Sequence, residues 1–138
     1  MFQLHPQLAK DCIEVGDFSL SKVLLVNDCY YPWVILVPKR EDVEEIYELS
    51  VPDQQQLLVE SSGVSAAMAV QFSADKMNVA ALGNLVPQLH IHHIVRYKSD
   101  VAWPKPVWGV TNTAVYPEEK LVDQLHLLQK ILLPLGIK

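Results

Sequence analysis

The 138-residue sequence contains little cysteine, no excess of positive charge and no long apolar run. Its two cysteines, Cys12 and Cys29, do not form a CxxC motif, which argues against a disulfide framework and favours reduced thiols in or near a core. The formal net charge of -5 disfavours binding to a nucleic-acid backbone. The N-terminal residues MFQLHPQLAKD lack a basic region followed by an apolar run, and no segment approaches the roughly 18 apolar residues of a membrane span. We therefore expect a cytoplasmic protein without a nucleic-acid or membrane partner.

Enough apolar sequence is present for one folded domain. Hydrophobic residues make up 50% of the chain and charged residues 20%. A chain of this length forms one ordinary domain with a real core. Because this length leaves no room for a second domain, we expect a single domain over residues 1–138.

The pattern of apolar and turn-forming residues predicts four strands. Two of them are expected to pair as antiparallel neighbours, because the connection NDCYYP between them is rich in turn formers. The predicted strands cover residues 18–27, 33–39, 76–82 and 89–97.

Three helices are predicted beside these strands. A short one is expected over residues 6–14, and a long one over residues 50–73, which opens with a capping box formed by Ser50 and Asp53. A final helix is expected from Glu118, with leucines at helical spacing on one side. Strands and helices in this order indicate an α+β protein with a largely antiparallel sheet.

The segment QLHIHHI, residues 88–94, concentrates three histidines in a predicted strand. Because successive side chains of a strand point to opposite faces, Gln88, His90 and His92 are expected on one face and His93 on the other. The apolar flanking residues favour a chemical pocket over an ordinary solvated face. A zinc site is a second chemical reading, because His-x-His can offer two nitrogens to the metal. No third ligand is placed near the pair by local spacing, so no metal site is assigned.

The segment GNLVPQLHIHHIVR resembles the signature region of the histidine triad (HIT) family, whose motif is His-φ-His-φ-His-φ-φ with φ apolar. In this alignment Gln88 takes the first triad position, His90 the second and His92 the third. The resemblance covers roughly residues 18–100 and leaves a C-terminal Trp/Pro segment and helix over residues 101–138. It implies a HIT-like fold, an antiparallel sheet of about five strands packed with two main helices, and a homodimer.

The resemblance also implies a function. Members of the family bind nucleotides and transfer or hydrolyse them at the α-phosphorus. His90 would be the nucleophile that forms a nucleotidyl-histidine, a role that suits imidazole because it is largely neutral at cytoplasmic pH. His92 would donate to a non-bridging oxygen or protonate the leaving group. We expect an adenosine phosphoramidate or a dinucleoside polyphosphate as the nucleotide substrate, and the double displacement requires no cofactor.

The resemblance further suggests residues that bind the nucleotide. Backbone amides around Gly83 and Asn84 suit phosphate oxygens, and Asn27 and Asp28 resemble the family residue that holds the ribose hydroxyls. A turn role explains Asp28 and Asn84 equally well, an exposed strand end explains Asn78 slightly better, and Arg96 could simply be solvated. The six candidates are Asn27, Asp28, Asn78, Gly83, Asn84 and Arg96.

Two positions depart from the family pattern. Gln88 keeps a donor and an acceptor, so it can still join a hydrogen-bond chain and is counted with His90 and His92 among the candidate catalytic residues, but it cannot carry charge or shuttle a proton. Leu85 stands where a hydroxyl residue is expected and so removes a phosphate contact. Two classes of function therefore stay open, a nucleotide hydrolase or transferase and a nucleotide-binding or interaction protein with little catalytic activity. The intact His90 and His92 pair favours the first class, with activity reduced in rate.

Overall fold

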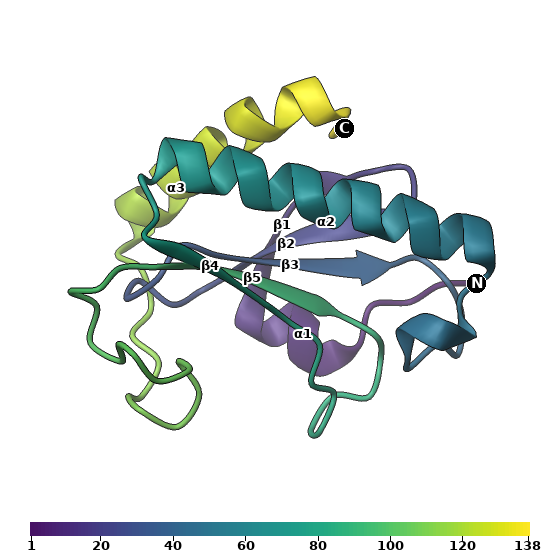
Figure 1. Cartoon of the computed structure of the whole chain (residues 1–138), viewed down its shortest axis with the longest axis horizontal. Coiled ribbons are helices and arrows are strands. Elements are labelled where there is room, and N and C mark those ends of the chain that lie inside the picture. Colours follow the sequence, from purple (N-terminus) through teal and green to yellow (C-terminus); the bar gives the residue numbers. More distant parts are fainter.

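The computed structural model describes all 138 residues and contains one five-stranded sheet in which every neighbouring pair of strands is antiparallel (Figure 1). The strand order is β1-β2-β3-β5-β4. The strands are β1 (Cys12–Asp17), β2 (Ser21–Val26), β3 (Trp33–Pro38), β4 (Lys76–Ala80) and β5 (Ile91–Arg96). The helices are α1 (Pro6–Asp11), α2 (Val51–Gln71) and α3 (Glu118–Leu132), with short 3-10 turns at Ile46–Glu48 and Leu133–Leu135. None of these helices combines the length and hydropathy needed to span a membrane.

The α+β class and the antiparallel sheet are confirmed, but the fifth strand was missed by the pattern of residues. The helix predicted over residues 6–14 ends at Asp11, and the chain passes directly into β1. Only Val15 of this edge strand is buried, so β1 lacks the alternation that identifies a half-buried strand. The backbone of Asp17 exchanges two hydrogen bonds with that of Lys138, of 2.9 and 3.0 Å. Gly16 permits this contact, because a Cβ atom there would lie 2.6 Å from the Lys138 carbonyl oxygen.

The long helix begins as predicted at Ser50, whose hydroxyl accepts a hydrogen bond from the amide of Asp53 at 3.2 Å. The reciprocal half of the predicted capping box is absent, because the Asp53 carboxylate pairs with Arg40 instead. Glu60, a charged residue of α2, is buried and accepts hydrogen bonds from the amides of Leu20 and Ser21. This carboxylate therefore ties α2 to the connection between β1 and β2.

The two faces of the sheet are covered differently. Helices α2 and α3 lie together on one face, where Val64, Met68, Leu128 and Leu132 pack against strand residues such as Val34 (Figure 1). The opposite face carries α1 and the long loops, and its apolar core is formed by Leu8, Leu24, Val26, Trp33, Ile35, Ile94, Val86 and Val107, among others. A short helix and loops leave room that two long helices would fill. The candidate site lies on this second face.

Candidate active site

A cavity of about 880 Å³ lies on the face of the sheet that bears α1. This volume is within the range typical of pockets for small molecules and cofactors. Its walls come from residues distant in the sequence: the segment 5–12, parts of β2 and β3, the loop 82–86, the histidine segment, and the residues Trp108, Thr113 and Val115. One lysine and one aspartate are the charged members of this lining.

His90 and His92 line the cavity together, as their spacing predicts. Their ring centroids are 4.9 Å apart, and both side chains are more than nine-tenths buried. His92 belongs to β5, whereas His90 immediately precedes it. The pair is therefore presented to one small volume by the start of a central strand.

The tautomer of His90 follows from its neighbour. The Nδ1 atom lies 2.7 Å from the backbone carbonyl oxygen of Gln88. Because a carbonyl oxygen only accepts hydrogen bonds, Nδ1 carries the hydrogen and donates it. In the neutral ring Nε2 then holds the lone pair, so His90 is prepared to act as a nucleophile through that atom.

His92 has the opposite tautomer. The indole N–H of Trp33 donates to Nδ1 of His92 over 3.0 Å, and an indole nitrogen cannot accept. The hydrogen of the neutral ring is therefore on Nε2. Burial lowers the pKa of His92 to about 3, and the charges of His90 and His93 act in the same direction. His92 is thus a neutral hydrogen-bond donor near pH 7, which favours contact with a phosphoryl oxygen over proton delivery to a leaving group.

Two tryptophans hold the His92 ring from the cavity face of the sheet. Trp33 on β3 and Trp108 in the loop after β5 lie with their ring centroids 5.6 and 5.1 Å from that of His92. The two indoles also meet edge to face, 5.8 Å apart. Trp33 was not among the predicted site residues, because its contact with His92 joins two strands that are far apart in the sequence. An indole that faces a histidine can be found only once the register of β3 and β5 is known.

His93 faces the opposite side of the sheet, in agreement with strand alternation. Its Nδ1 donates to the carbonyl oxygen of Val34 at 3.3 Å, and its Nε2 accepts from the hydroxyl of Ser61 on α2 at 2.7 Å. The side chain is fully buried, and burial lowers its pKa to about 4. Both nitrogens are occupied, so His93 has a structural role.

The loop before the histidines lines another wall of the cavity, and Gly83 and Asn84 both belong to it. The backbone amides of these two residues donate to no backbone carbonyl of the chain, so they are free to bind a ligand. Gly83 has a φ of +80°, a left-handed conformation that glycine adopts without strain. Leu85 is almost fully exposed beside them. It offers no polar atom from its side chain.

Gln88 does not take the place that strand alternation gives it. The strand begins only at Ile91, and Gln88 lies in the preceding bend, outside the cavity lining. Its amide group is directed to the N-terminal segment: Oε1 accepts from the backbone amide of His5 at 2.9 Å, and Nε2 donates to the carbonyl oxygen of Gln3 at 2.8 Å. The side chain of Gln88 is therefore a clamp on that segment. We do not assign it a direct chemical role.

Of the two residues predicted to hold a ribose, the structure brings one to the cavity. Asn27 lines it, while its Oδ1 accepts a hydrogen bond from the amide of Tyr116 at 2.9 Å. Asp28 is buried outside the lining, and its carboxylate caps the turn by accepting from the amide of Tyr30. The turn role of Asp28 is thus the one that its contacts support.

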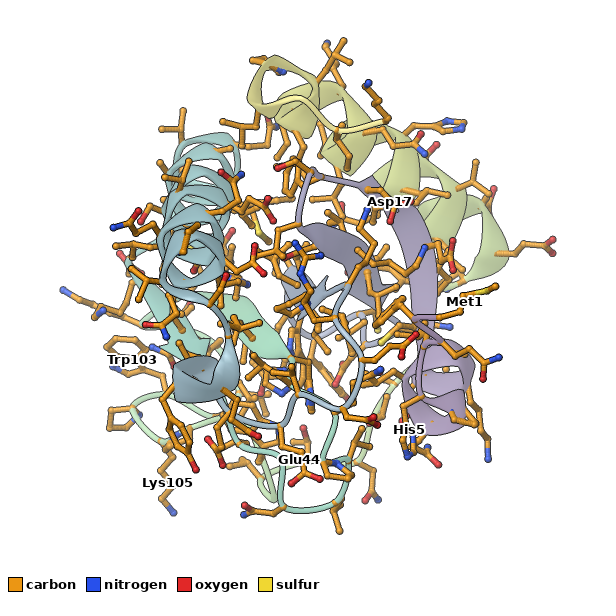
Figure 2. All side chains as sticks on the ribbon, turned by 90° about the vertical axis from the view of Figure 1, so that its right-hand side faces the viewer. Met1, His5, Asp17, Glu44, Trp103 and Lys105 are labelled. Atoms are coloured by element: carbon orange, nitrogen blue, oxygen red, sulfur yellow. The ribbon has the colours of Figure 1, made fainter.

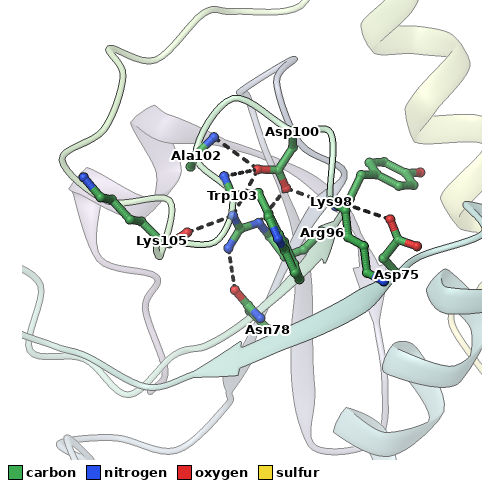
Figure 3. Close-up of polar contacts among 9 residues, drawn as sticks. Asp75, Asn78, Arg96, Lys98, Asp100, Ala102, Trp103 and Lys105 are labelled. Carbon is green, nitrogen blue, oxygen red and sulfur yellow. Dashed lines mark hydrogen bonds and ion pairs between the residues drawn. The ribbon is translucent and has the colours of Figure 1, made fainter.

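Arg96 and Asn78 also lie outside the cavity. They belong to a separate cluster of polar contacts around the buried Arg96 (Figure 3). The guanidinium group donates to both carboxylate oxygens of Asp100, at 2.8 and 3.0 Å, to Oδ1 of Asn78 at 2.7 Å and to the carbonyl oxygen of Lys105 at 2.8 Å. Burial alone would raise the pKa of Asp100, but the hydrogen bonds and charge of Arg96 outweigh it and hold that pKa low. With its donors engaged, Arg96 holds the loop after β5 and is not available to a phosphate.

The structure offers no set of ligands for the zinc site that was the alternative to a catalytic pair. No group of three or more histidine, cysteine, aspartate or glutamate side chains is arranged to hold a metal ion. Cys12 does line the cavity, but burial, followed by the charge of Asp11, raises the pKa of its thiol to about 12. The thiol is therefore protonated near pH 7 and is a poor nucleophile.

Comparison with known proteins agrees with this geometry. Residues 7–99 match the HIT domain family. The chain belongs to the HIT family. A histidine triad protein from Marinobacter aquaeolei VT8 is 54% identical to this HIT protein, with a TM-score of 0.96 and coverage of 99% of each chain. No curated protein matches the sequence.

Two further solved structures extend the comparison. A histidine triad protein from Bradyrhizobium japonicum is 46% identical, with a TM-score of 0.91 and coverage of 94% of this chain and 96% of the other. Diadenosine triphosphate hydrolase from Plasmodium falciparum is 15% identical, with a TM-score of 0.64 and coverage of 97% and 84%. At that identity the likeness shows the fold alone. The five-stranded antiparallel sheet predicted from the HIT resemblance is confirmed.

Proposed function

We propose that this HIT protein is a nucleotide hydrolase or nucleotidyl transferase that acts at the α-phosphorus of a nucleoside phosphoramidate or dinucleoside polyphosphate. The observation that carries the proposal is the hydrogen bond from Nδ1 of His90 to the carbonyl oxygen of Gln88, which leaves the lone pair on Nε2. Two comparisons support the proposal. The chain has a HIT domain, which is associated with functions that involve nucleotides, and one solved protein of the same fold is a diadenosine triphosphate hydrolase.

The proposed reaction has two steps. In the first, Nε2 of His90 attacks the α-phosphorus, a P–N bond forms, and the bond to the leaving group breaks with its electron pair on that group, which departs as a phosphate or, after taking a proton from solvent, as an amine. The positive charge on the imidazole ring is stabilised by the Nδ1–H donated to the Gln88 carbonyl. In the second, water or another acceptor attacks phosphorus and releases its proton to solvent, the P–N bond breaks, and His90 recovers its lone pair.

The other cavity residues bind the nucleotide in this proposal. The Nε2–H of His92 donates to a non-bridging oxygen, as do the free amides of Gly83 and Asn84. Asn27 keeps an amide group at the cavity for the ribose. Such donors matter because the protein has a net charge of -5 and the cavity lining is itself nearly neutral. We extend the proposal to a homodimer, supported by the unpaired edge of β4 and the exposed Val79 on it.

The test is steady-state hydrolysis of adenosine 5′-phosphoramidate and of a diadenosine polyphosphate by the wild type and by His90→Ala. We expect the substitution to reduce turnover on the order of 10⁴-fold or more, because it removes the nucleophile. A nucleotidyl mass on the wild type that is absent from His90→Ala identifies the intermediate. Wild-type protein that binds nucleotide without turnover would contradict the proposal and leave a nucleotide-binding protein.

A further inference from the structure

A third imidazole lies at the cavity beside the two of the histidine segment. His5 precedes α1 (Figure 2). It lines the cavity with His90 and His92, although it is far from them in the sequence. It is half-buried. The sequence alone offers His5 only as a distant, unplaced histidine.

Gln88 holds His5 and His90 at the same time. Its side-chain amide bonds the backbone on both sides of Leu4, at the His5 amide and at the Gln3 carbonyl oxygen. Its own backbone carbonyl accepts the hydrogen of His90 Nδ1. One residue therefore contacts both the N-terminal segment and the nucleophile, so His5 enters the cavity wall from a segment held beside His90.

The free atom of His5 is a hydrogen-bond donor. The backbone amide of Gln7 donates to its Nδ1 at 3.1 Å, so in the neutral ring the hydrogen is on Nε2. The hydrogen bonds of His5 within the chain use Nδ1 and the backbone, and none uses Nε2. His5 thus matches His92, whose Nδ1 is occupied and whose Nε2–H is available.

The charge of the cavity makes such a donor useful. Lys10 and Asp11 are the charged side chains of the lining, and no arginine belongs to it. The two charges have opposite signs, so the lining has no net charge and neutral N–H donors add to what Lys10 can contribute to the binding of an anionic ligand. A phosphoryl group, which carries several acceptor oxygens, is the part of a nucleotide that needs them most.

We propose that His5 is a substrate-binding residue that donates a hydrogen bond from Nε2 to a phosphoryl oxygen of the nucleotide, and that Gln88 is its positioning residue. This inference rests on the proposed function in that it takes a nucleotide as the ligand. It adds a residue outside the histidine motif to the site. It also gives a role to the side chain that occupies the first triad position.

Binding of AMP and of adenosine, measured by calorimetry, tests the role of His5. His5→Ala should weaken AMP binding about 10-fold or more, the loss expected for a hydrogen bond to a charged group. Adenosine lacks the phosphate, so its affinity should remain within about twofold. His126→Ala is the matched control, because His126 is exposed on α3 and outside the cavity lining. Unchanged AMP affinity, or an equal loss for both ligands, would overturn the assignment.

A double-mutant cycle tests the role of Gln88. Gln88→Ala removes the side-chain clamp but keeps the carbonyl group that bonds His90. It should weaken AMP binding alone, yet cost little more when His5 is already alanine, because residues that act as a unit are not additive. Additive losses would overturn the positioning role. Thermal unfolding of each variant checks that it is folded.

The experiment separates this inference from the proposed function. A wild type that binds AMP and loses affinity on His5→Ala, but does not turn over either substrate, would refute the catalytic proposal and support His5. A wild type that turns over substrate with unchanged AMP affinity in His5→Ala would refute only the role of His5. A wild type that neither binds AMP nor turns over either substrate would refute both.

Discussion

Two buried polar sites lie on the same face of β5, and they differ in how many hydrogen-bonding atoms are left open. At one end, His92 has a single partner, Trp33, and its Nε2–H lies at the cavity. At the other end, Arg96 makes four hydrogen bonds to Asp100, Asn78 and Lys105. Arg96 carries the charge that a phosphate would attract, yet it has little left to offer. The open atoms, not the formal charge, separate a binding residue from a structural one.

His93 is the third case on the strand. It has the same side chain as His92 and is its immediate neighbour, but both of its nitrogens are bonded and it packs under α2. Strand alternation therefore distinguishes two adjacent imidazoles, and the hydrogen-bond partners decide what each can do.

Of the changes that test this contrast between His92 and Arg96, Arg96→Met should have the largest effect, and the effect is on stability. Removal of the guanidinium group leaves the Asp100 carboxylate, whose side chain is 5% exposed, without its positively charged partner and with only backbone amides as donors. We expect a loss of about 3 to 5 kcal/mol in the free energy of unfolding, measured by urea denaturation. AMP affinity of the protein that remains folded should change little. A large loss of affinity at unchanged stability would instead place Arg96 in the binding site and remove the contrast.

The second effect is acid destabilisation from the buried neutral histidines. The pKa values of His92 and His93 are lowered to about 3 and about 4, whereas in the unfolded chain both are about 6.5. Below pH 6.5 the unfolded state therefore binds more protons than the folded state, and stability falls as the pH drops toward 4. We expect a loss of about 2 to 3 kcal/mol between pH 7.5 and 5.5, with none of it present above pH 7.

Urea denaturation across this pH range measures the loss. His92→Asn, which cannot be protonated, should remove about half of the pH dependence. His126→Ala is the control and should retain all of it, because that histidine is exposed. A wild type with no pH dependence between 7.5 and 5.5 would mean that the two imidazoles are not buried in the neutral form. The pKa of Asp100 is lowered as well, so its contribution is lost only in more acid solution.

The smallest expected effect comes from Trp33→Phe, which tests whether Trp33 keeps the hydrogen of the His92 ring on Nε2. Trp33→Phe keeps the aromatic packing but removes the N–H that donates to Nδ1 of His92. The hydrogen of the ring can then move to Nδ1, and we expect about a 10-fold fall in kcat/KM for the phosphoramidate. Nitrogen NMR of the imidazole reports the tautomer directly. Trp108→Phe is the matched control, because no hydrogen bond joins Trp108 to His92. An equal loss in both variants would attribute the effect to packing.

Much of the fold could be predicted because the local signals are strong. The helix that begins at Glu118 and the strand pair before Lys39 have clear apolar periodicity and turn residues. β1 could not be recognised, since it presents one buried residue and starts without a break after α1. Its identity as a strand depends on pairing with β2, which is a property of the folded chain.

The candidate site was predictable only where it is local. His90 and His92 are two residues apart, and their pairing follows from strand geometry. Trp33 and His5 line the same cavity but come from distant parts of the chain, so their spacing in the sequence does not predict that they belong to the site. For Arg96 the sequence suggests a role that the contacts do not support. Its position near the motif suggests a contact with the ligand, but its guanidinium group already makes four hydrogen bonds within the protein.

The walls of the cavity come from the first residues of the chain, the middle strands and the loop that precedes α3. A ligand that fills it therefore acts as a non-covalent crosslink between parts of the protein that meet only in the folded state. At a free concentration about 100 times its Kd, such a ligand stabilises the folded chain by about 2.7 kcal/mol. The rise in unfolding temperature would report on occupancy even for a molecule that is bound and never turned over, which makes thermal stability a direct way to search for the natural ligand.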